Sequence, residues 1–153
     1  MPTPTPNPSP VPVPGPAPAA GAAAPRVLVA DASLSNRRLI REALGAFRQC
    51  EVDDASNAEH AFERALQRTY SLFIFSMTLP DMPGTLLDRL LSHVYPRVHV
   101  GTHTAPQVIY LVRADEMPGY HEIQRHARVR GATPLPLNLD ELLKQTAGLL
   151  PQK

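Results

Sequence analysis

The stretch SLFIFSMTLPDMPG, residues 71–84, decides the fold. Its first six residues, 71–76, form an apolar run between two serines, as expected for a central parallel strand that is buried on both faces. The run then ends in Ser-Met-Thr and breaks at a loop that contains two prolines and a glycine. In an open α/β sheet, ligands and chemistry lie just beyond the carboxyl ends of the strands. Ser76 therefore stands at the edge where a reacting group would be found.

The chain of 153 residues changes in composition after residue 25. Its first 25 residues hold ten prolines and no charged side chain. Alternating X-Pro pairs exclude a helix and favour polyproline II. We expect residues 1–25 to be a disordered Pro/Ala-rich tail, which is either a linker or a ligand for an aromatic-lined groove. Residues 26–150 are enough for one domain with a single core.

Composition and charge exclude several classes of protein. The tail lacks the charged start and apolar core of a signal peptide, and no later run has the length of a membrane span. The net charge is +1, so no strong attraction to nucleic acid or to a membrane surface is expected. One cysteine, Cys50, allows no internal disulfide and fits a reducing compartment. We expect a cytoplasmic protein.

Outward from residues 71–84, strand and helix patterns alternate along the chain. The expected strands are residues 26–30, 50–55, 71–76, 107–112 and the proline-interrupted stretch 134–137. The expected helices are residues 36–47, a segment that follows residues 56–57 and contains 58–66, and residues 85–94, 116–130 and 139–147. Such alternation predicts parallel strands joined by right-handed crossovers, with helices on both faces of the sheet. Residues 96–106 are expected to form a long loop.

Caps and buried positions follow from the same patterns. The expected helix caps are Ser35 or Asn36, Ser56 or Asn57, and Asn138. The buried stripe of the first helix is expected to be Leu39, Ile40, Ala43, Leu44 and Phe47. The second is expected to bury Ala58, Ala61, Phe62, Ala65 and Leu66, and the third Leu86, Leu87, Leu90, Leu91 and Val94. The last helix is expected to bury Leu139, Leu142, Leu143 and Ala147.

Three motifs in this order resemble the receiver domain of two-component response regulators, over essentially all of residues 26–150. RVLVADASLSNRRLIREAL, from residue 26, is similar to the first strand, acidic loop and first helix of that family. SLFIFSMTLPDMPG is similar to its third strand and following turn, and GATPLPLNLDELL, from residue 131, to its fifth-strand region and last helix. The resemblance implies a flavodoxin-like (βα)5 three-layer sandwich whose sheet has the strand order 2-1-3-4-5.

The resemblance also implies a phosphorylation site, and this sequence departs from it at almost every position. Receivers carry a phosphoryl group on an aspartate after the third strand, where Ser76 stands here. Their two acids after the first strand help to hold Mg²⁺, but here only Asp31 remains, followed by Ala32. Their hydroxyl residue ending the fourth strand corresponds to Val112, and their lysine falls on or near Leu135. We therefore expect no aspartyl phosphorylation, no bound metal and no cofactor.

Several side chains have two interpretations. Ser76 is either a nucleophile, which would need a nearby base, or a strand-end residue bonded to the backbone. Asp31 is either a metal ligand or an acceptor for amides at the start of the following helix. His99 and His103 are either metal ligands or exposed polar residues of a loop. The basic cluster of Arg125, His126, Arg128 and Arg130 is either a solvated face or part of a docking patch.

These expectations lead to a pseudo-receiver that is not an enzyme and that signals by protein–protein contact in a two-component-type pathway. Its partner would be a kinase, an output protein or a scaffold, and a homodimer is also open. By resemblance, the partner face lies within residues 125–143 and includes Arg125, Arg128, Arg130, Leu135 and Leu142. One alternative is a switch in which a Ser/Thr kinase phosphorylates Ser76 or Thr78. The other is a small-ligand sensor whose pocket is formed by Asp31, Ser33, Ser76 and Thr78.

Overall fold

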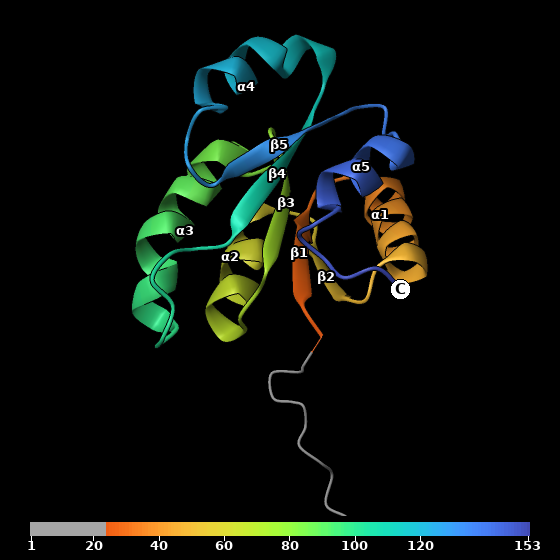
Figure 1. The fold of residues 1–153 in the computed structure, drawn as a ribbon. Helices are drawn as coiled ribbons and strands as arrows, with labels where there is room; N and C mark the ends of the chain where they lie inside the picture. Colours follow the sequence, from red (N-terminus) through yellow and green to blue (C-terminus); the bar gives the residue numbers. More distant parts are fainter. Residues whose placement is uncertain (1–23) are drawn as a thin grey trace, which may run out of the picture.

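The computed structural model describes residues 24–153, in which five parallel strands alternate with five α-helices (Figure 1). The strands are β1 (Arg26–Ala30), β2 (Glu51–Ala55), β3 (Leu72–Ser76), β4 (Gln107–Val112) and β5 (Val129–Pro134). The helices are α1 (Leu34–Phe47), α2 (Ala58–Gln67), α3 (Gly84–Val98), α4 (Met117–Ile123) and α5 (Leu139–Thr146), with a 3-10 turn η2 (Ala114–Glu116) before α4. The sheet order is β2-β1-β3-β4-β5, so the flavodoxin-like α/β prediction is confirmed. Residues 1–23 of the expected tail lie outside the described residues.

The sheet is the middle of three layers, and alternate strand residues supply two separate cores. Val27 and Val29 of β1 pack on the side of α1 and α5, while Leu28 and Ala30 pack on the side of α2 and α3. Figure 1 shows these two pairs of helices on opposite sides of the sheet. All five residues of β3 are buried, as expected for the central strand. Each large apolar side chain buried in this way contributes roughly 1.5–3 kcal/mol.

The first helix begins two residues earlier than expected. Its N-cap is Ser33, whose Oγ accepts a hydrogen bond from the backbone N–H of Asn36. Of the predicted stripe, Ile40, Ala43 and Leu44 are buried, but Leu39 and Phe47 are exposed. The buried stripe of α1 is therefore narrower than predicted. The predicted caps Asn57 and Asn138 are confirmed for α2 and α5.

The third helix is longer than expected and shortens the predicted loop at residues 96–106. Helix α3 continues through Pro96 and ends at Val98. A proline this close to the end of a helix removes only one backbone hydrogen bond. Tyr95 is buried on the α2 side, and its hydroxyl accepts a hydrogen bond from the backbone N–H of Tyr70 (2.7 Å). Leu90, by contrast, lies on the exposed side of α3.

The fourth helix and the fifth strand depart most from the sequence prediction. Helix α4 ends at Ile123, and the strand occupies residues 129–134 in place of 134–137. The edge position expected for this proline-containing strand is correct. Gly131 conceals the strand pattern, and a Cβ there would lie 2.1 Å from the side-chain oxygen of Gln145, so that this side chain would have to shift.

Beyond α5 the chain returns to the end of α1. The backbone N–H of Gln49 donates to the carbonyl of Pro151 (2.8 Å), and that of Lys153 donates to the carbonyl of Phe47 (3.2 Å). Leu150 is buried in the core between the sheet, α1 and α5. This C-terminal strap, residues 147–153, is therefore part of the folded domain. No helix within residues 24–153 has the length and hydropathy needed to span a membrane.

Candidate functional site

The predicted site residues meet at the carboxyl edge of the sheet. Asp31 directly follows β1, Ser76 ends β3 and Val112 ends β4, and the three strands are neighbours. Leu135 follows β5 and lies beside Val112, because its backbone N–H donates to the Val112 carbonyl (2.8 Å). The parallel fold thus gathers residues that are more than 100 positions apart in the sequence, at the place where open α/β sheets bind ligands.

Asp31 is buried, with 4 % of its surface exposed, and both of its carboxylate oxygens are already hydrogen-bonded. Oδ1 accepts from the backbone N–H of Ser33 (2.7 Å), and Oδ2 accepts from the side-chain amide of Asn36 (3.2 Å). These bonds agree with the interpretation of Asp31 as an acceptor at the helix start, although the amide belongs to the cap residue. A metal ion at Asp31 would have to displace them. Ala32, where receivers have their second acid, is exposed and offers no ligand oxygen on its side chain.

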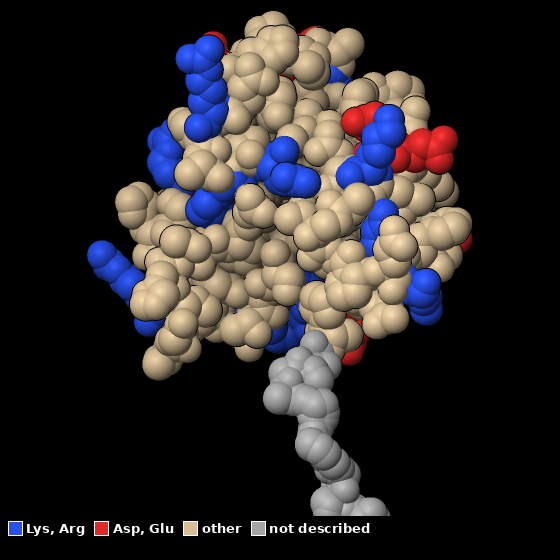
Figure 2. Space-filling view, in the orientation of Figure 1, with Lys and Arg blue, Asp and Glu red and all other residues tan. Residues whose placement is uncertain are grey.

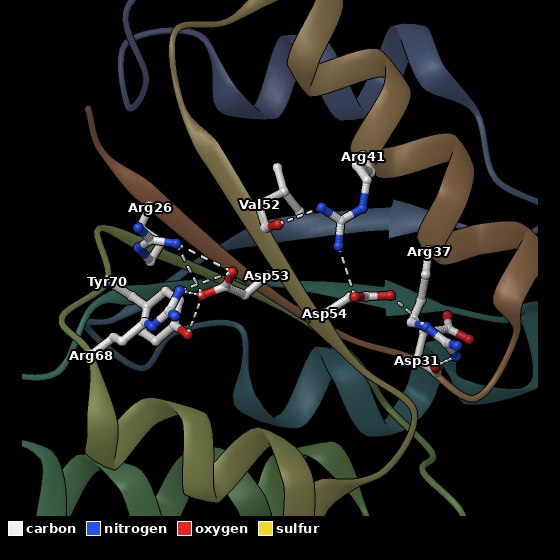
Figure 3. Close-up of polar contacts among 9 residues, drawn as sticks. All are labelled: Arg26, Asp31, Arg37, Arg41, Val52, Asp53, Asp54, Arg68 and Tyr70. Atoms are coloured by element: carbon white, nitrogen blue, oxygen red, sulfur yellow. Dashed lines mark hydrogen bonds and ion pairs between the residues drawn. The ribbon is translucent and has the colours of Figure 1, made fainter. Parts of the chain in front are cut away.

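A guanidinium group that sequence analysis did not single out holds the loop after β1. Arg37 donates from Nη1 to the carbonyls of Asp31 (2.8 Å) and Ala32 (3.2 Å), and from Nε to Asp54 Oδ2 (2.8 Å). Arg41, one turn further along α1, donates to the other oxygen of Asp54 (2.8 Å). Figure 3 shows both arginines reaching from α1 to β2, with Arg37 beside Asp31. A guanidinium group that is paired with Asp54 thus holds the backbone of the acidic loop in place.

Ser76 is buried, with 6 % of its surface exposed, and its hydroxyl donates to the backbone carbonyl of Thr78 (3.0 Å). Among the described residues, no histidine nitrogen is hydrogen-bonded to it. Gly84, the first residue of α3, packs against the end of β3, where a Cβ would lie 1.9 Å from the Ser76 carbonyl oxygen. Ser76 therefore has the environment of a residue bonded to the backbone, with no base to activate it.

Glu116 connects the loops after β3 and β4. Its carboxylate accepts hydrogen bonds from the Thr78 hydroxyl and from the backbone N–H of Arg113 (2.8 Å for the latter). The Arg113 guanidinium also forms an ion pair with it (3.3 Å). Sequence analysis missed Glu116 and Arg113. The available signal was a glutamate three residues after Arg113, where it can accept from the backbone at the start of a helical turn.

The two remaining family positions are apolar. Val112 is buried at the end of β4, and Leu135 is half-buried against the core on the side of α1 and α5. Neither a hydroxyl nor an ammonium group is therefore available at these two places to contact a phosphoryl group. Ser33, which was assigned to the same pocket, uses its hydroxyl as the N-cap of α1.

The predicted partner face is only partly exposed. Arg125 and Arg130 are exposed, but the Arg128 side chain is mostly buried and paired with Asp88 of α3. Leu142 of α5 is fully buried in the core, so its assignment to the partner face is wrong. The apolar spacing of the last helix predicted that Leu142 is buried in the core, and that prediction is confirmed. The basic cluster also lies after α4 and in β5, because the helix ends before Arg125.

The histidines do not form a metal site in the described part of the chain. No three His, Cys, Asp or Glu side chains within residues 24–153 are grouped so that they could hold a metal ion. His99 packs on Tyr95, and its Nε2 is 2.6 Å from the carbonyl oxygen of Ala65. His99 is thus a half-buried contact between α3 and α2, where an exposed loop residue was predicted; His103 is exposed.

A second polar cluster surrounds Asp53 in the edge strand β2. Arg26 and Arg68 form ion pairs with its carboxylate (3.2 Å each), and the Tyr70 hydroxyl donates to it (2.7 Å), as Figure 3 shows. Burial favours the neutral acid, but the Tyr70 hydrogen bond and the two positive charges outweigh it and lower the pKa of Asp53. Burial and the neighbouring carboxylate raise the pKa of Tyr70. All these groups are satisfied by one another, so the cluster has a structural role.

Comparison with solved structures finds the same fold in receiver domains. The signal receiver domain of an HD domain-containing protein from Pseudomonas fluorescens Pf-5 superposes with a TM-score of 0.68 at 18 % identity, covering 82 % of this chain and 86 % of its own. Chemotaxis protein CheY4 of Vibrio cholerae gives 0.67 at 21 % identity, covering 84 % and 100 %. The REC domain of the response regulator AraT from Geobacillus stearothermophilus gives 0.69 at 23 % identity, covering 83 % and 93 %.

No family model matches the chain, and no curated protein matches it. At these identities the likeness is one of fold, and function has to be argued from the site.

Proposed function

We propose that residues 26–150 are a receiver-like signalling module that acts by binding a protein partner and whose conformation is not set by aspartyl phosphorylation. The partner is a two-component-type kinase, an output protein or a scaffold, and self-association is a further form of the same contact. The module performs no reaction of its own and needs no cofactor for this function.

The main support is the chemistry of the carboxyl edge. A phosphoryl-accepting receiver needs an ionised carboxylate and a metal ion to neutralise the developing charge. Here the acceptor position is a buried serine that is bonded to the Thr78 carbonyl. Both carboxylate oxygens of the remaining acid, Asp31, already accept hydrogen bonds from Ser33 and Asn36. The Glu116 carboxylate would also repel a phosphoryl group that approached Thr78.

The proposal is tested first by a thermal melt of the purified protein with and without Mg²⁺ and beryllofluoride, a mimic of the aspartyl phosphate. A ligand that binds the native state raises the melting temperature by mass action. We expect no shift in this protein and a clear shift in an intact receiver that is measured alongside it. A Mg²⁺-dependent rise in this protein would refute the phosphorylation-independent mechanism.

A restored variant provides the matched control. Ala32→Asp, Ser76→Asp, Val112→Thr and Leu135→Lys together return the four missing groups to the same backbone. If their loss explains the lack of response, the restored variant gains a Mg²⁺-dependent shift while the wild type does not. Circular dichroism confirms that both are folded before the comparison is made.

Partner binding is tested on the exposed part of the predicted face. Arg125 and Arg130 are exposed after α4 and in β5, so charge reversal there changes the surface without disturbing the core. We expect Arg125→Glu with Arg130→Glu to abolish capture of a partner that the wild type retains. The control pair Arg38→Glu and Arg64→Glu, exposed on α1 and α2, should retain it. Equal capture by both variants would show that the partner binds to another face of the protein.

In the alternative in which a Ser/Thr kinase phosphorylates the protein, only one of the two candidate residues is accessible to a kinase. Ser76 is buried, whereas Thr78 is exposed, although its hydroxyl is bonded to Glu116. Incubation with Ser/Thr kinases and mass spectrometry tests it, and a phosphate on Thr78 would favour this alternative.

Thermal-shift screening with nucleotides tests the second alternative, a small-ligand sensor whose pocket is formed by Asp31, Ser33, Ser76 and Thr78.

A further inference from the structure

A cleft beside the exposed arginines of the predicted partner face shares Arg128 with that face, but none of its lining residues belongs to the former phosphorylation site at the carboxyl edge of the sheet. It lies between α3 and the segment that joins α4 to β5, and its volume is about 270 Å³. At roughly 30 Å³ per water molecule, this is space for about nine waters. The cleft is therefore slightly smaller than the usual range of pockets for drug-sized ligands, about 300–1,000 Å³, and suits a small molecule or a single side chain.

The base of the cleft carries a fixed ion pair. Arg128 donates to both oxygens of Asp88, with distances of 3.1 and 2.6 Å, and its Nε donates to the carbonyls of Ala105 (3.2 Å) and Pro106 (3.0 Å). Tyr110 of β4 is buried beside them, and its burial together with the Asp88 charge raises the pKa of its phenol. The phenol is therefore neutral at physiological pH. Asp88 and Arg128 neutralise each other and are held in place by backbone contacts.

The outer part of the cleft carries positive charge without a matching acid. Arg89 and His126 line it, and neither forms an ion pair with any acid within residues 24–153. The lining charges are one negative (Asp88) and two positive (Arg128 and Arg89), which leaves a net charge of +1 when the histidine is not counted. Figure 2 shows blue side chains with no red among them over α3 and β5, whereas red side chains gather near α5.

The remaining walls divide into apolar and hydroxyl-bearing surfaces. Ile123 and Val129 line one side together with the ring of Tyr110. Thr85 and Ser92 line the α3 side, seven residues apart and so on the same face of the helix. A ligand that fits has an apolar body for the first surface and an anionic group for Arg89. Pockets of this kind, mostly apolar with a few convergent polar groups, are typical of small-ligand sites.

We propose that this cleft binds an organic carboxylate with a small apolar body, and that Arg89 is the residue that pairs with the carboxylate. Guanidinium and carboxylate groups match in geometry and form charge-assisted hydrogen bonds. The apolar body contacts Ile123, Val129 and the Tyr110 ring. The inference uses none of the residues at the carboxyl edge of the sheet, although the cleft shares Arg128 with the predicted partner face.

The test uses phenylacetate as the probe and phenylacetamide as its neutral counterpart of nearly the same shape. Thermal melts of the full chain are recorded over a concentration series of each. At ten times its Kd, phenylacetate should raise the melting temperature by on the order of 5 °C and in a saturable manner. Phenylacetamide should bind about tenfold more weakly. No saturable shift with phenylacetate, or an equal shift with phenylacetamide, would overturn the proposal.

Two variants of the same helix assign the contact to Arg89. Arg89→Gln removes the charge at the cleft and should weaken phenylacetate binding about tenfold. Arg97→Gln removes a charge from the exposed last turn of α3, outside the cleft, and should bind as the wild type does. Both positions are exposed, so both variants are expected to fold. Equal weakening in the two variants would indicate a general charge effect and would overturn the assignment.

The carboxylate could belong to a free acid or to the C-terminus of a peptide, and a second pair of probes separates the two. Acetyl-Leu-Phe is titrated with its carboxylate free and with its C-terminus amidated. Tighter binding of the free-carboxylate peptide than of phenylacetate assigns the cleft to a protein C-terminus, and weaker binding assigns it to a small acid. If neither phenylacetate nor this peptide binds, the proposal fails, whatever the outcome of the beryllofluoride experiment.

Discussion

Glu116 and Asp31 show how single carboxylates at the carboxyl edge are held by the protein itself. Asp31 is bound to the start of α1, and Glu116 is bound to the loops after β3 and β4. In this protein the Thr78–Glu116 hydrogen bond joins them in the absence of any phosphoryl group. The two loops are therefore expected to keep one arrangement until a partner changes it.

This contact can be measured directly by mutation. Glu116→Ala leaves the Thr78 hydroxyl and the Arg113 N–H without their acceptor, so we expect a loss of about 1–2 kcal/mol in the free energy of unfolding. Urea denaturation gives this value. Asp115→Ala is the matched control, because Asp115 is exposed and pairs only with the exposed Arg113 side chain. It should change stability by less than about 0.5 kcal/mol. Equal effects would show that Glu116 does not connect the loops.

Asp53 makes the stability of the domain depend on acid pH. Its folded-state pKa is lowered, so its contribution is fully present above the unfolded-state pKa of about 3.9 and is lost as pH falls through the lowered folded value. We expect the free energy of unfolding to decrease below about pH 4. Asp53→Asn should be less stable than the wild type at pH 7 and lose less stability on acidification.

The measurement is a series of urea denaturations between pH 2 and pH 7. Asp140→Asn is the control, because this residue is exposed in the first turn of α5 and forms no ion pair within residues 24–153. Its profile should follow that of the wild type. An Asp53→Asn profile parallel to the wild type across the acid range would mean that the Arg26, Arg68 and Tyr70 contacts do not favour the ionised acid.

At the scale of the elements, the turn from β3 into α3 depends on Gly84. Its Cα faces the end of β3, and a Cβ would lie 1.9 Å from the Ser76 carbonyl oxygen, a backbone atom that cannot move aside. Gly84→Ala should therefore cost about 3 kcal/mol or more in the free energy of unfolding. Gly45→Ala in α1 is the opposite case, since nothing lies within 4 Å of the added Cβ. It should stabilise the protein by about 0.5–1 kcal/mol.

Thermal and urea denaturation of the two glycine variants measures both effects. They share the same chemical change and differ only in what the added methyl group meets. If Gly84→Ala were as stable as the wild type, the close approach of α3 to Ser76 would be wrong, and with it the geometry of the candidate site.

Asp81 links the same loop to a different helix. Its two carboxylate oxygens accept hydrogen bonds from the backbone N–H groups of Ala58 (2.8 Å) and Glu59 (2.9 Å), at the start of α2. Asp81→Ala should cost about 1 kcal/mol, the usual value for a lost helix cap. Asp81→Asn, which keeps an acceptor oxygen, should recover part of it. Urea denaturation measures both, and identical stability of Asp81→Ala and the wild type would contradict the capping role.

Elements with an uninterrupted local signal could be predicted, and those shaped by distant contacts could not. Strand β3 is apolar at nearly every position, which only a central strand explains. Strand β5 begins five residues before the predicted stretch, because Gly131 weakens the local strand pattern and because the more apolar Pro-Leu repeat lies just after it. The predicted helix at 116–130 ends at Ile123 instead, and Arg128, which the prediction placed in the helix, lies just before β5 and pairs with Asp88 on α3.

The same distinction holds for the candidate site. The positions of Asp31, Ser76, Val112 and Leu135 at one edge could be predicted from strand ends and parallel topology. The roles of Arg37 and Glu116 could not, because each depends on contacts between separate elements. Arg37 reaches Asp54 across 17 positions, and Glu116 reaches Thr78 across 38. Charged residues in an amphipathic helix or a polar loop give no sequence signal for such contacts.

At the scale of the whole molecule, the C-terminal strap closes the core at the end of the sheet opposite the candidate site. Leu150 is buried, Arg48 binds Thr146 (3.1 Å) and the Leu143 carbonyl (2.6 Å), and the strap pairs with the end of α1. Leu150→Ala should cost about 2–3 kcal/mol through lost burial and the cavity left behind. Removal of residues 148–153 should cost more, because the backbone pairing is lost too. Lys153→Ala, at the exposed end, should change stability by less than about 0.5 kcal/mol.

Changes in the strap should lower the free energy of unfolding without altering the candidate site. The strap joins α1, α5 and the amino end of β2, whereas the site lies at the carboxyl edge of the sheet. The Arg89 cleft should likewise keep its phenylacetate affinity in Leu150→Ala at a temperature where the variant remains folded. Denaturation and a phenylacetate titration on the same sample measure the two quantities together. If Leu150→Ala lost affinity as well as stability, the two cores on either side of the sheet would be coupled. A partner bound on the α1–α5 side could then regulate the cleft on the α3 side.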